Sequence, residues 1–442
     1  MIDVSKKTTN AARISAEKYK AFQNGVKNII DFKEIIKKSL TQNISELSEI
    51  ILRGAVSLDA SDIHIEPEEK EAKIRVRIDG VLQDVIAVNQ ETHQNLLSRI
   101  KLLSELKLNI SDRPQDGRFT VLISGEILEN EVEIRTSTLP SEYGESIVLR
   151  ILNPKNLINL EALGLRKDLY SFFEKEIKKP NGMIIVTGPT GSGKTTTLYA
   201  FLKKIHNPEI KIITIEDPIE YHLKGISQTQ VAPEKKYDFV SGLKSIMRQD
   251  PDVILVGEIR DLETAEIALQ AALTGHLVFS TLHTNDAAGT VARLISLGAK
   301  AVNIGPALNI AIAQRLVRKA CPRCLQKKTI SEMDFKKIKD ALSNIPKTAD
   351  SPKLTATIKI PEPDPKGCED CNFTGYKGRV GIFEAVLVND EMENFILQNP
   401  SIASFRKEAI RKGMTTMLQD GLIKVLQGVT TIVEVERVAG EQ

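Results

Sequence analysis

The sequence has no tryptophan, and aromatic residues make up only 5% of its 442 residues. Proteins that grip single-stranded nucleic acids usually set aromatic side chains among basic ones, so this composition does not favour a nucleic-acid-binding protein. Charge adds no such signal, because 60 Lys and Arg face 58 Asp and Glu and leave a formal net charge of +2. No stretch approaches the roughly 20 apolar residues of a membrane-spanning helix, and the N-terminus lacks the apolar run of a secretory signal. We therefore expect a cytosolic protein.

Cysteine is also scarce, and its placement is informative. The four cysteines form two short pairs, Cys321-Pro-Arg-Cys324 and Cys368-Glu-Asp-Cys371. Two such pairs can supply four thiolates to one tetrahedral structural zinc ion, and a cytosolic location disfavours disulfides. We predict a Zn²⁺ site made by all four, with reduced free thiols as the next alternative and disulfides last.

The chain is long enough for two or three domains, each with its own core. Its first segment is basic, and apolar residues recur there at helical spacing from Val26 to Leu40, which predicts an amphipathic helix. The apolar stripe needs a partner: the rest of the chain, another protein or a membrane surface. The predicted boundaries are 1–44 for this basic helical segment, 45–153 for a small α/β domain, 154–164 for a linker, 165–320 for a larger α/β domain, 321–385 for a tetracysteine module and 386–442 for a helical C-terminal region.

A phosphate-binding loop is the strongest motif. The apolar run 183–187 leads directly into G-x-x-x-x-G-K-T, which predicts a strand, a loop and a helix. The glycines let backbone N–H groups turn toward phosphates, Lys194 reaches the β and γ oxygens of ATP, and the Thr195 hydroxyl can ligate Mg²⁺. The helix N-terminus also favours the anion. The predicted nucleotide-binding residues are Gly188, Pro189, Thr190, Gly191, Ser192, Gly193, Lys194, Thr195 and Thr196.

Three more apolar runs follow this loop, with polar residues at their ends. The runs are 211–215, 252–256 and 277–282, and the candidate residues beside them are Glu216, Glu258, His276 and His283. In a doubly wound sheet, ligands bind at the carboxyl ends of the strands, where such residues can meet. One carboxylate can orient or deprotonate the attacking water while another supports Mg²⁺. The sequence leaves open which glutamate is the base, and whether either histidine senses the γ-phosphate or is an ordinary structural residue.

Taken together, the motifs resemble the GspE/PilB family of type II secretion and type IV pilus assembly ATPases. They are the P-loop at 188–195, ITIEDPIEY (213–221), DVILVGEIRD (252–261), ALTGHLVFSTLHTNDA (272–287), and, before them, SDIHIEP (61–67), IRVRIDG (74–80) and RPQDGRF (113–119). The resemblance implies a RecA-like P-loop motor domain on a doubly wound sheet, preceded by a smaller, PAS-like α/β domain. It further implies ATP hydrolysis with Mg²⁺, a homo-hexamer, and a cytoplasmic site at the inner face of the membrane, reached through an inner-membrane platform protein. Pilus, secretion and DNA-uptake filaments remain alternatives.

The family resemblance also points to arginines outside the motor domain. In the family the smaller domain supplies arginines to nucleotide phosphates, and Arg113 and Arg118 occupy the matching motif. Guanidinium groups suit that role because they stay charged and offer forked donors. Arg75 and Arg77 share one strand face and either assist or are simply solvated. Ser146 stands where the family often has arginine, so one phosphate or interface contact is expected to be missing.

The cysteine module favours an assembly motor, since retraction motors that resemble PilT lack it. Two other classes remain as alternatives: a ring-shaped nucleic-acid translocase, which the low aromatic content disfavours, and a nucleotide-dependent regulator without turnover, which the intact Glu216 and Glu258 disfavour.

Overall fold

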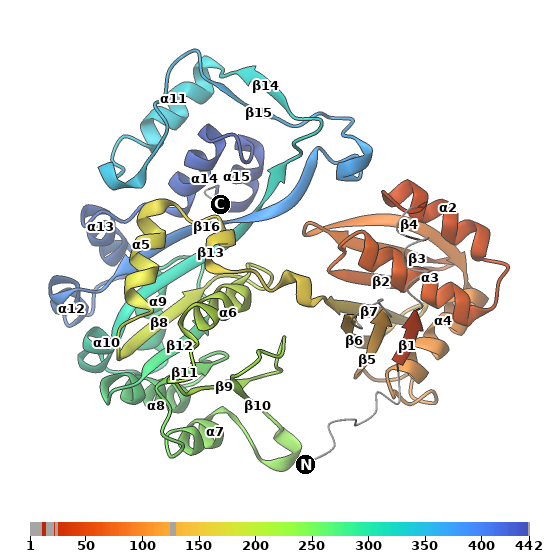
Figure 1. The fold of residues 1–442 in the computed structure, drawn as a ribbon, viewed down its shortest axis with the longest axis horizontal. Coiled ribbons are helices and arrows are strands. Elements are labelled where there is room, and N and C mark those ends of the chain that lie inside the picture. Colours follow the sequence, from red (N-terminus) through yellow and green to blue (C-terminus); the bar gives the residue numbers. More distant parts are fainter. Residues whose placement is uncertain (1–10, 15–21, 23–24, 124–129, 441–442) are drawn as a thin grey trace. The chain divides into compact units, whose positions relative to one another are not determined.

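The computed structural model describes the chain except for residues 1–10, 15–21, 23–24, 124–129 and 441–442, so the start of the predicted basic segment lies outside the described residues. The chain divides into two compact units (Figure 1). Unit 1 comprises Met1–Asn156, Cys321–Cys324 and Asp364–Lys377, and unit 2 comprises Leu157–Ala320, Leu325–Pro363 and Gly378–Gln442. Among the described residues, no helix has both the length and the apolar character needed to cross a membrane.

Unit 1 is built on one seven-stranded sheet with the strand order β1-β5-β6-β7-β2-β3-β4. The strands are β1 (Ala11–Ile14), β2 (Asp62–Pro67), β3 (Glu71–Ile78), β4 (Val81–Asn89), β5 (Gln115–Ile123), β6 (Asn130–Ser141) and β7 (Gly144–Leu152), and the helices are α2 (Ile29–Ser39), α3 (Ile44–Ser57) and α4 (Gln90–Leu103). β1 pairs with β5 in parallel, and the other neighbours are antiparallel. Along β3 every second side chain is buried, so one face of the sheet carries the core and the other carries the polar residues.

Helix α2 supplies part of that core. Its Phe32 and Ile36 are fully buried in the same cluster as residues of α3 and the sheet. Asn28 caps the helix, because its Oδ1 accepts hydrogen bonds from the backbone N–H groups of Ile30 and Asp31 at 2.9 and 3.0 Å. Most of the apolar stripe predicted from the sequence therefore packs against the chain itself, whereas Ile30 is 52% exposed.

Unit 2 carries a second seven-stranded sheet with the order β10-β9-β11-β12-β8-β13-β16. Its strands are β8 (Gly182–Thr187), β9 (Ile212–Glu216), β10 (Ser227–Gln230), β11 (Val253–Val256), β12 (Leu277–Leu282), β13 (Leu308–Ala320) and β16 (Tyr376–Leu387), with a separate β14 (Gln326–Thr329) and β15 (Lys359–Glu362). Its helices are α5 (Lys167–Glu176), α6 (Lys194–Ile205), α7 (Phe239–Ile246), α8 (Leu262–Leu273), α9 (Ala288–Ser296), α10 (Ala301–Ala307), α11 (Glu332–Ala341), α12 (Asp390–Ile396), α13 (Ile402–Arg411), α14 (Met417–Leu426) and α15 (Ile432–Ala439).

Helices cover both faces of this sheet (Figure 1). Met183 and Ile185 of β8 belong to a core cluster shared with α8 and α9, whereas Ile184 and Val186 belong to a cluster shared with α5 and α6. The strands from β10 to β13 are parallel, so their carboxyl ends meet at one edge. This doubly wound arrangement is the one predicted from the sequence, and the residues that follow β8, β9, β11 and β12 share that edge.

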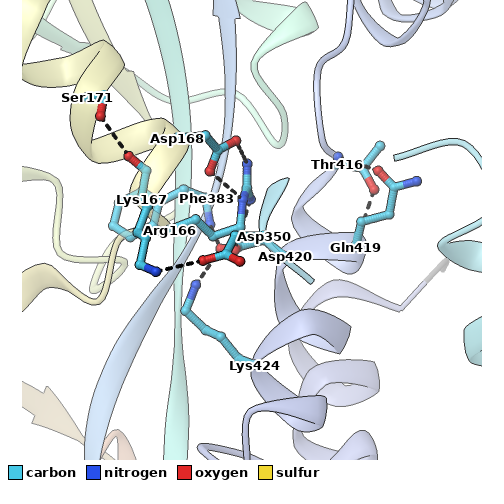
Figure 2. Close-up of polar contacts among 10 residues, drawn as sticks. All are labelled: Arg166, Lys167, Asp168, Ser171, Asp350, Phe383, Thr416, Gln419, Asp420 and Lys424. Atoms are coloured by element: carbon cyan, nitrogen blue, oxygen red, sulfur yellow. Dashed lines mark hydrogen bonds and ion pairs between the residues drawn. The ribbon is translucent and has the colours of Figure 1, made fainter. Parts of the chain in front are cut away.

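A buried charge network ties the start of α5 to the C-terminal helices of unit 2 (Figure 2). Arg166, the N-cap of α5, donates from Nη1 to Asp420 Oδ1 of α14 at 2.9 Å and from Nε to Asp168 Oδ1 at 3.1 Å. Asp420 is completely buried. Its other oxygen accepts from Lys424 Nζ and from the backbone N–H of Phe383 on β16, each at 2.7 Å. Asp420 thus joins α5, α14 and β16.

We expect Asp420→Asn to lower the free energy of unfolding of unit 2 by about 3 kcal/mol, because it leaves two buried cations with too little negative charge. The midpoint of urea unfolding measures the loss. Lys167→Ala is the matched control: Lys167 pairs with Asp350 at 3.0 Å, but both side chains are largely exposed, and such pairs contribute little. Equal midpoints for the two variants would contradict a stabilising role for Asp420.

Candidate nucleotide-binding site

The phosphate-binding loop connects β8 to α6 at the carboxyl edge of the sheet. Gly193 is the N-cap of α6 and has a φ of 89°, a left-handed backbone that favours glycine. The Lys194 ammonium folds over the loop and donates to the backbone oxygens of Gly188 at 2.8 Å and Pro189 at 3.2 Å. Burial lowers the pKa of Lys194, while the negative charge of Glu258 opposes that shift. The lysine is therefore held at the mouth of the loop, within the electrostatic reach of Glu258.

Glu258 follows β11 at the same edge. Its carboxylate is 13% exposed and forms an ion pair with Arg260, and His283 Nε2 lies 3.3 Å from its Oε2. Both partners are more than half exposed, so they can move away when a ligand arrives. Glu258 is thus a carboxylate near the predicted phosphate position whose two side-chain partners are exposed at the surface.

Glu216 lies at the end of β9 and has a different environment. It is 3% exposed, and the chain supplies three donors to its two oxygens. Thr214 Oγ1 donates to Oε1 at 2.6 Å, Gln228 Nε2 donates to the same oxygen at 3.2 Å, and the Tyr199 hydroxyl donates to Oε2. Burial, together with this carboxylate, raises the pKa of Tyr199 well above its usual value. Glu216 is consequently fixed by α6, β9 and β10.

The two predicted histidines lie at opposite ends of β12. His283 follows the strand, and the loop there is pinned to the end of β8, because Thr284 N–H donates to Thr187 Oγ1 at 2.8 Å and Thr187 Oγ1 donates to Leu282 O at 3.0 Å. His276 precedes the strand, and its Nδ1 lies 3.0 Å from a backbone oxygen of α8. β12 has six residues, so its ends are about 20 Å apart. The structure brings His283 to the P-loop edge and does not bring His276 there.

A row of four arginines crosses the polar face of the unit 1 sheet. Cross-strand register places Arg118 of β5 opposite Arg135 of β6, and Arg135 opposite Arg150 of β7. Asp62 of β2 comes next and faces both Arg150 and Arg77 of β3. Directly opposed residues lie on the same face of a sheet. We call these four arginines the arginine row.

One buried acid stands within this row. Asp62 accepts from Arg150 Nε at 3.1 Å and pairs with Arg77 Nε at 3.3 Å. Arg118 is exposed, and Arg135 has an acidic neighbour on its own strand at 3.5 Å. Arg135 and Arg150 are not among the arginines predicted from the sequence. Their alternation with buried residues could have placed them on a polar face, but only the register shows that they align with Arg118.

The remaining candidates in unit 1 lie around this row. Arg113 is exposed and precedes β5. Arg75 pairs with Glu66 on the neighbouring strand β2. The Ser146 hydroxyl donates to the backbone oxygen of Leu139 at 3.2 Å. Arg113 therefore keeps its charged group at the surface, whereas Arg75 and Ser146 have partners within the sheet.

The four cysteines converge within unit 1. Their sulfur atoms all lie within 4.8 Å of one another, and neighbouring sulfurs are 3.7 to 3.8 Å apart. A tetrahedron with metal–sulfur bonds of about 2.3 Å has edges of about 3.8 Å, whereas a disulfide needs about 2.05 Å. Burial disfavours the thiolate of Cys371, but backbone N–H groups of Cys368 and Gly375 donate to it and lower its pKa to about 7. The donor set and its spacing fit a tetrahedral metal ion.

Known proteins resemble the chain over most of its length. A family model described as "Type II/IV secretion system protein" matches residues 37–437. The type IV pilus assembly ATPase PilB of Myxococcus xanthus is 40% identical, over 96% of this chain and 74% of PilB. The type II secretion system ATPase E of Vibrio cholerae is 44% identical, over 90% of this chain and 76% of the relative.

Solved structures of known ATPases have a fold similar to that of this chain. The pilus retraction motor PilT, crystallised with ADP, is 28% identical, with a TM-score of 0.57 over 88% of this chain and 96% of PilT. The ATPase DotB of Yersinia pseudotuberculosis has a TM-score of 0.66 over 91% of this chain and 95% of DotB, and at 20% identity this likeness concerns the fold alone.

Proposed function

The chain belongs to the Type II/IV secretion system protein family, and we propose that it works as a Mg²⁺-dependent ATPase whose hydrolysis site is built around Lys194 and Glu258. It is a motor ATPase of the kind that drives assembly of a type II secretion pseudopilus or a type IV pilus. The observation that carries the proposed site is the placement of the P-loop, Glu258 and His283 at one edge of the sheet.

Each residue at that edge is assigned a separate role in binding or hydrolysing ATP. Backbone N–H groups of the P-loop hold the phosphates, and Lys194 exchanges its two backbone acceptors for phosphate oxygens. The Thr195 hydroxyl would bind Mg²⁺, and the ion would neutralise charge on the phosphates. His283, released from Glu258, is placed to donate to the γ-phosphate.

Glu258 is the better candidate for the base. A base needs a free oxygen that can accept a hydrogen bond from the attacking water. Both carboxylate oxygens of Glu216 already accept hydrogen bonds, from three donors within the chain, and the residue is 3% exposed. Among the described residues, the partners of the Glu258 carboxylate are two side chains that reach it from exposed positions. We assign Glu258 to orienting or deprotonating water and Glu216 to positioning α6 and β9 around the site.

The arginine row and Arg113 are proposed to supply guanidinium groups to nucleotide phosphates, by closure within a subunit or from a neighbouring subunit. Four guanidiniums beside the two carboxylates of Asp62 and Glu133 leave a cationic face that is suited to an anion. Differential contacts to ATP and ADP would then couple hydrolysis to movement. We further propose a homo-hexameric ring at the cytoplasmic face of the inner membrane that acts on a platform protein, with zinc at the four cysteines.

We expect purified protein with Mg²⁺ and ATP to release phosphate at a rate per chain that rises with protein concentration, as a ring with shared sites requires. Arg118→Gln and Arg135→Gln should each lower this rate about tenfold or more, because each removes charge that stabilises the transferring phosphoryl group.

Lys194→Ala gives the background rate of phosphate release in this assay. Arg411→Gln is the matched control, since Arg411 is exposed on α13 and forms an ion pair with its helix neighbour Glu408. Wild-type turnover that equals the Lys194→Ala background at every concentration would contradict the ATPase, and full activity of both arginine variants would contradict the role of the arginine row.

A further inference from the structure

Gln314 lies beside the phosphate-binding loop, and none of the motifs in the sequence includes it. It sits on β13, which pairs in parallel with β8 and places Ala313 opposite Thr187. Gln314 therefore directly follows the last residue of β13 that pairs with β8, and Gly188 directly follows that residue's partner, Thr187. Its side chain is 2% exposed, and a buried amide in this position calls for an explanation.

The Gln314 amide is oriented by the first helix after the loop. Thr197 of α6, which is fully buried, donates from Oγ1 to Gln314 Oε1 at 2.6 Å. With Oε1 engaged, the NH₂ end of the amide lies against Gly193: a Cβ placed on Gly193 would come within 2.8 Å of Gln314 Nε2. The amide is thus wedged between the last glycine of the loop and the first turn of α6.

The backbone of the same residue closes on the other end of the loop. A Cβ placed on Gly188 would come within 2.5 Å of the Gln314 carbonyl oxygen. One residue therefore touches both glycines that bound the loop, from the strand on the side away from Glu258, because β8 lies between β12 and β13 in the sheet. The two sides of the loop are supported differently: catalytic groups stand on one side, and Gln314 stands on the other.

We infer that Gln314 is a positioning residue that holds the phosphate-binding loop in its nucleotide-binding shape through its contact with Thr197. If the loop has to become ordered when the nucleotide binds, affinity for the nucleotide is lower. The apparent dissociation constant rises as the fraction of molecules with a binding-competent loop falls. The amide is neutral, so it supports the loop without placing negative charge beside the phosphates. The effect falls on nucleotide binding, whereas the chemical step depends on groups across the loop.

The test measures binding of a fluorescent ADP analogue and, separately, KM and kcat for ATP. Gln314→Met keeps the length of the side chain but loses its polar atoms, and Thr197→Val keeps the shape of threonine but loses its donor. Each variant should weaken ADP binding and raise KM about tenfold, while kcat at saturating ATP changes less than about twofold. Thr197→Ser restores the hydroxyl and should bind ADP as the wild type does.

A double-mutant cycle isolates the contact. If Gln314 and Thr197 act through one hydrogen bond, the double variant should bind ADP no worse than either single variant. ADP affinity within twofold of wild type in folded Gln314→Met would overturn the positioning role, as would additive losses in the double variant or a fall in kcat without a change in binding. The positioning role rests on the proposed nucleotide site, and that site fails separately if the wild type binds ADP no better than Lys194→Ala does.

Discussion

Glu258→Gln is expected to lower ATP turnover by at least about 100-fold while ADP binding stays within a few-fold of wild type. General base catalysis by a positioned carboxylate contributes about 100- to 10,000-fold, and an amide of the same shape cannot take the proton from water. Binding should survive because the loop and Lys194 hold the phosphates. Single-turnover phosphate release and fluorescent-ADP titration measure the two quantities separately.

The matched comparison is Glu216→Gln. An amide at position 216 must place an NH₂ group among donors from Tyr199, Thr214 and Gln228, so at least one buried donor loses its acceptor, at a cost of about 1 to 3 kcal/mol. We expect a lower unfolding midpoint and a smaller loss of turnover than in Glu258→Gln. If Glu216→Gln abolishes turnover at unchanged stability and Glu258→Gln retains it, the assignment of the base is reversed.

The larger sheet and its phosphate loop could be predicted because their signals are local. Apolar runs of strand length end in polar residues, and the G-x-x-x-x-G-K-T motif requires a strand before it and a helix after it. The structure has β8 at Gly182–Thr187 and α6 from Lys194. Strand lengths in unit 1 are harder to predict from the sequence: β6 spans Asn130–Ser141, and its later residues are not strongly apolar.

The assignment of roles within the site needed the structure. Histidines at both ends of one apolar run look equivalent in sequence, yet parallel pairing puts His283 at the P-loop edge and His276 at the other. Glu216 and Glu258 look equivalent as well, and only the donors around Glu216 separate them. Arg135, Arg150 and Gln314 carry no motif, because cross-strand register and a buried contact between β13 and α6 are not local properties of a sequence.

Removal of the metal is expected to loosen the start of α2 as well as the cysteine cluster. Asn372, the residue after Cys371, accepts a hydrogen bond from the backbone N–H of Ile29 at 2.8 Å, so the cysteine loop helps to cap the helix. Structural sites bind Zn²⁺ with an apparent free energy of about 10 to 16 kcal/mol, and this binding free energy contributes to folding. We expect one zinc ion per chain, and chelation should speed hydrogen exchange at the Ile29 amide by at least about tenfold.

Asn372→Ala separates the cap from the metal. It removes the acceptor for Ile29 without touching a thiolate, so zinc content should stay at one per chain while the exchange of the Ile29 amide still rises. Cys324→Ser should lose both zinc and the protection of Ile29, because three thiolates no longer close the tetrahedron. Wild-type protein without bound zinc would contradict the metal site. Unchanged exchange at Ile29 after complete chelation would show that the cysteine loop keeps its shape without the ion, and that the cap depends on the backbone turn at Asn372 alone.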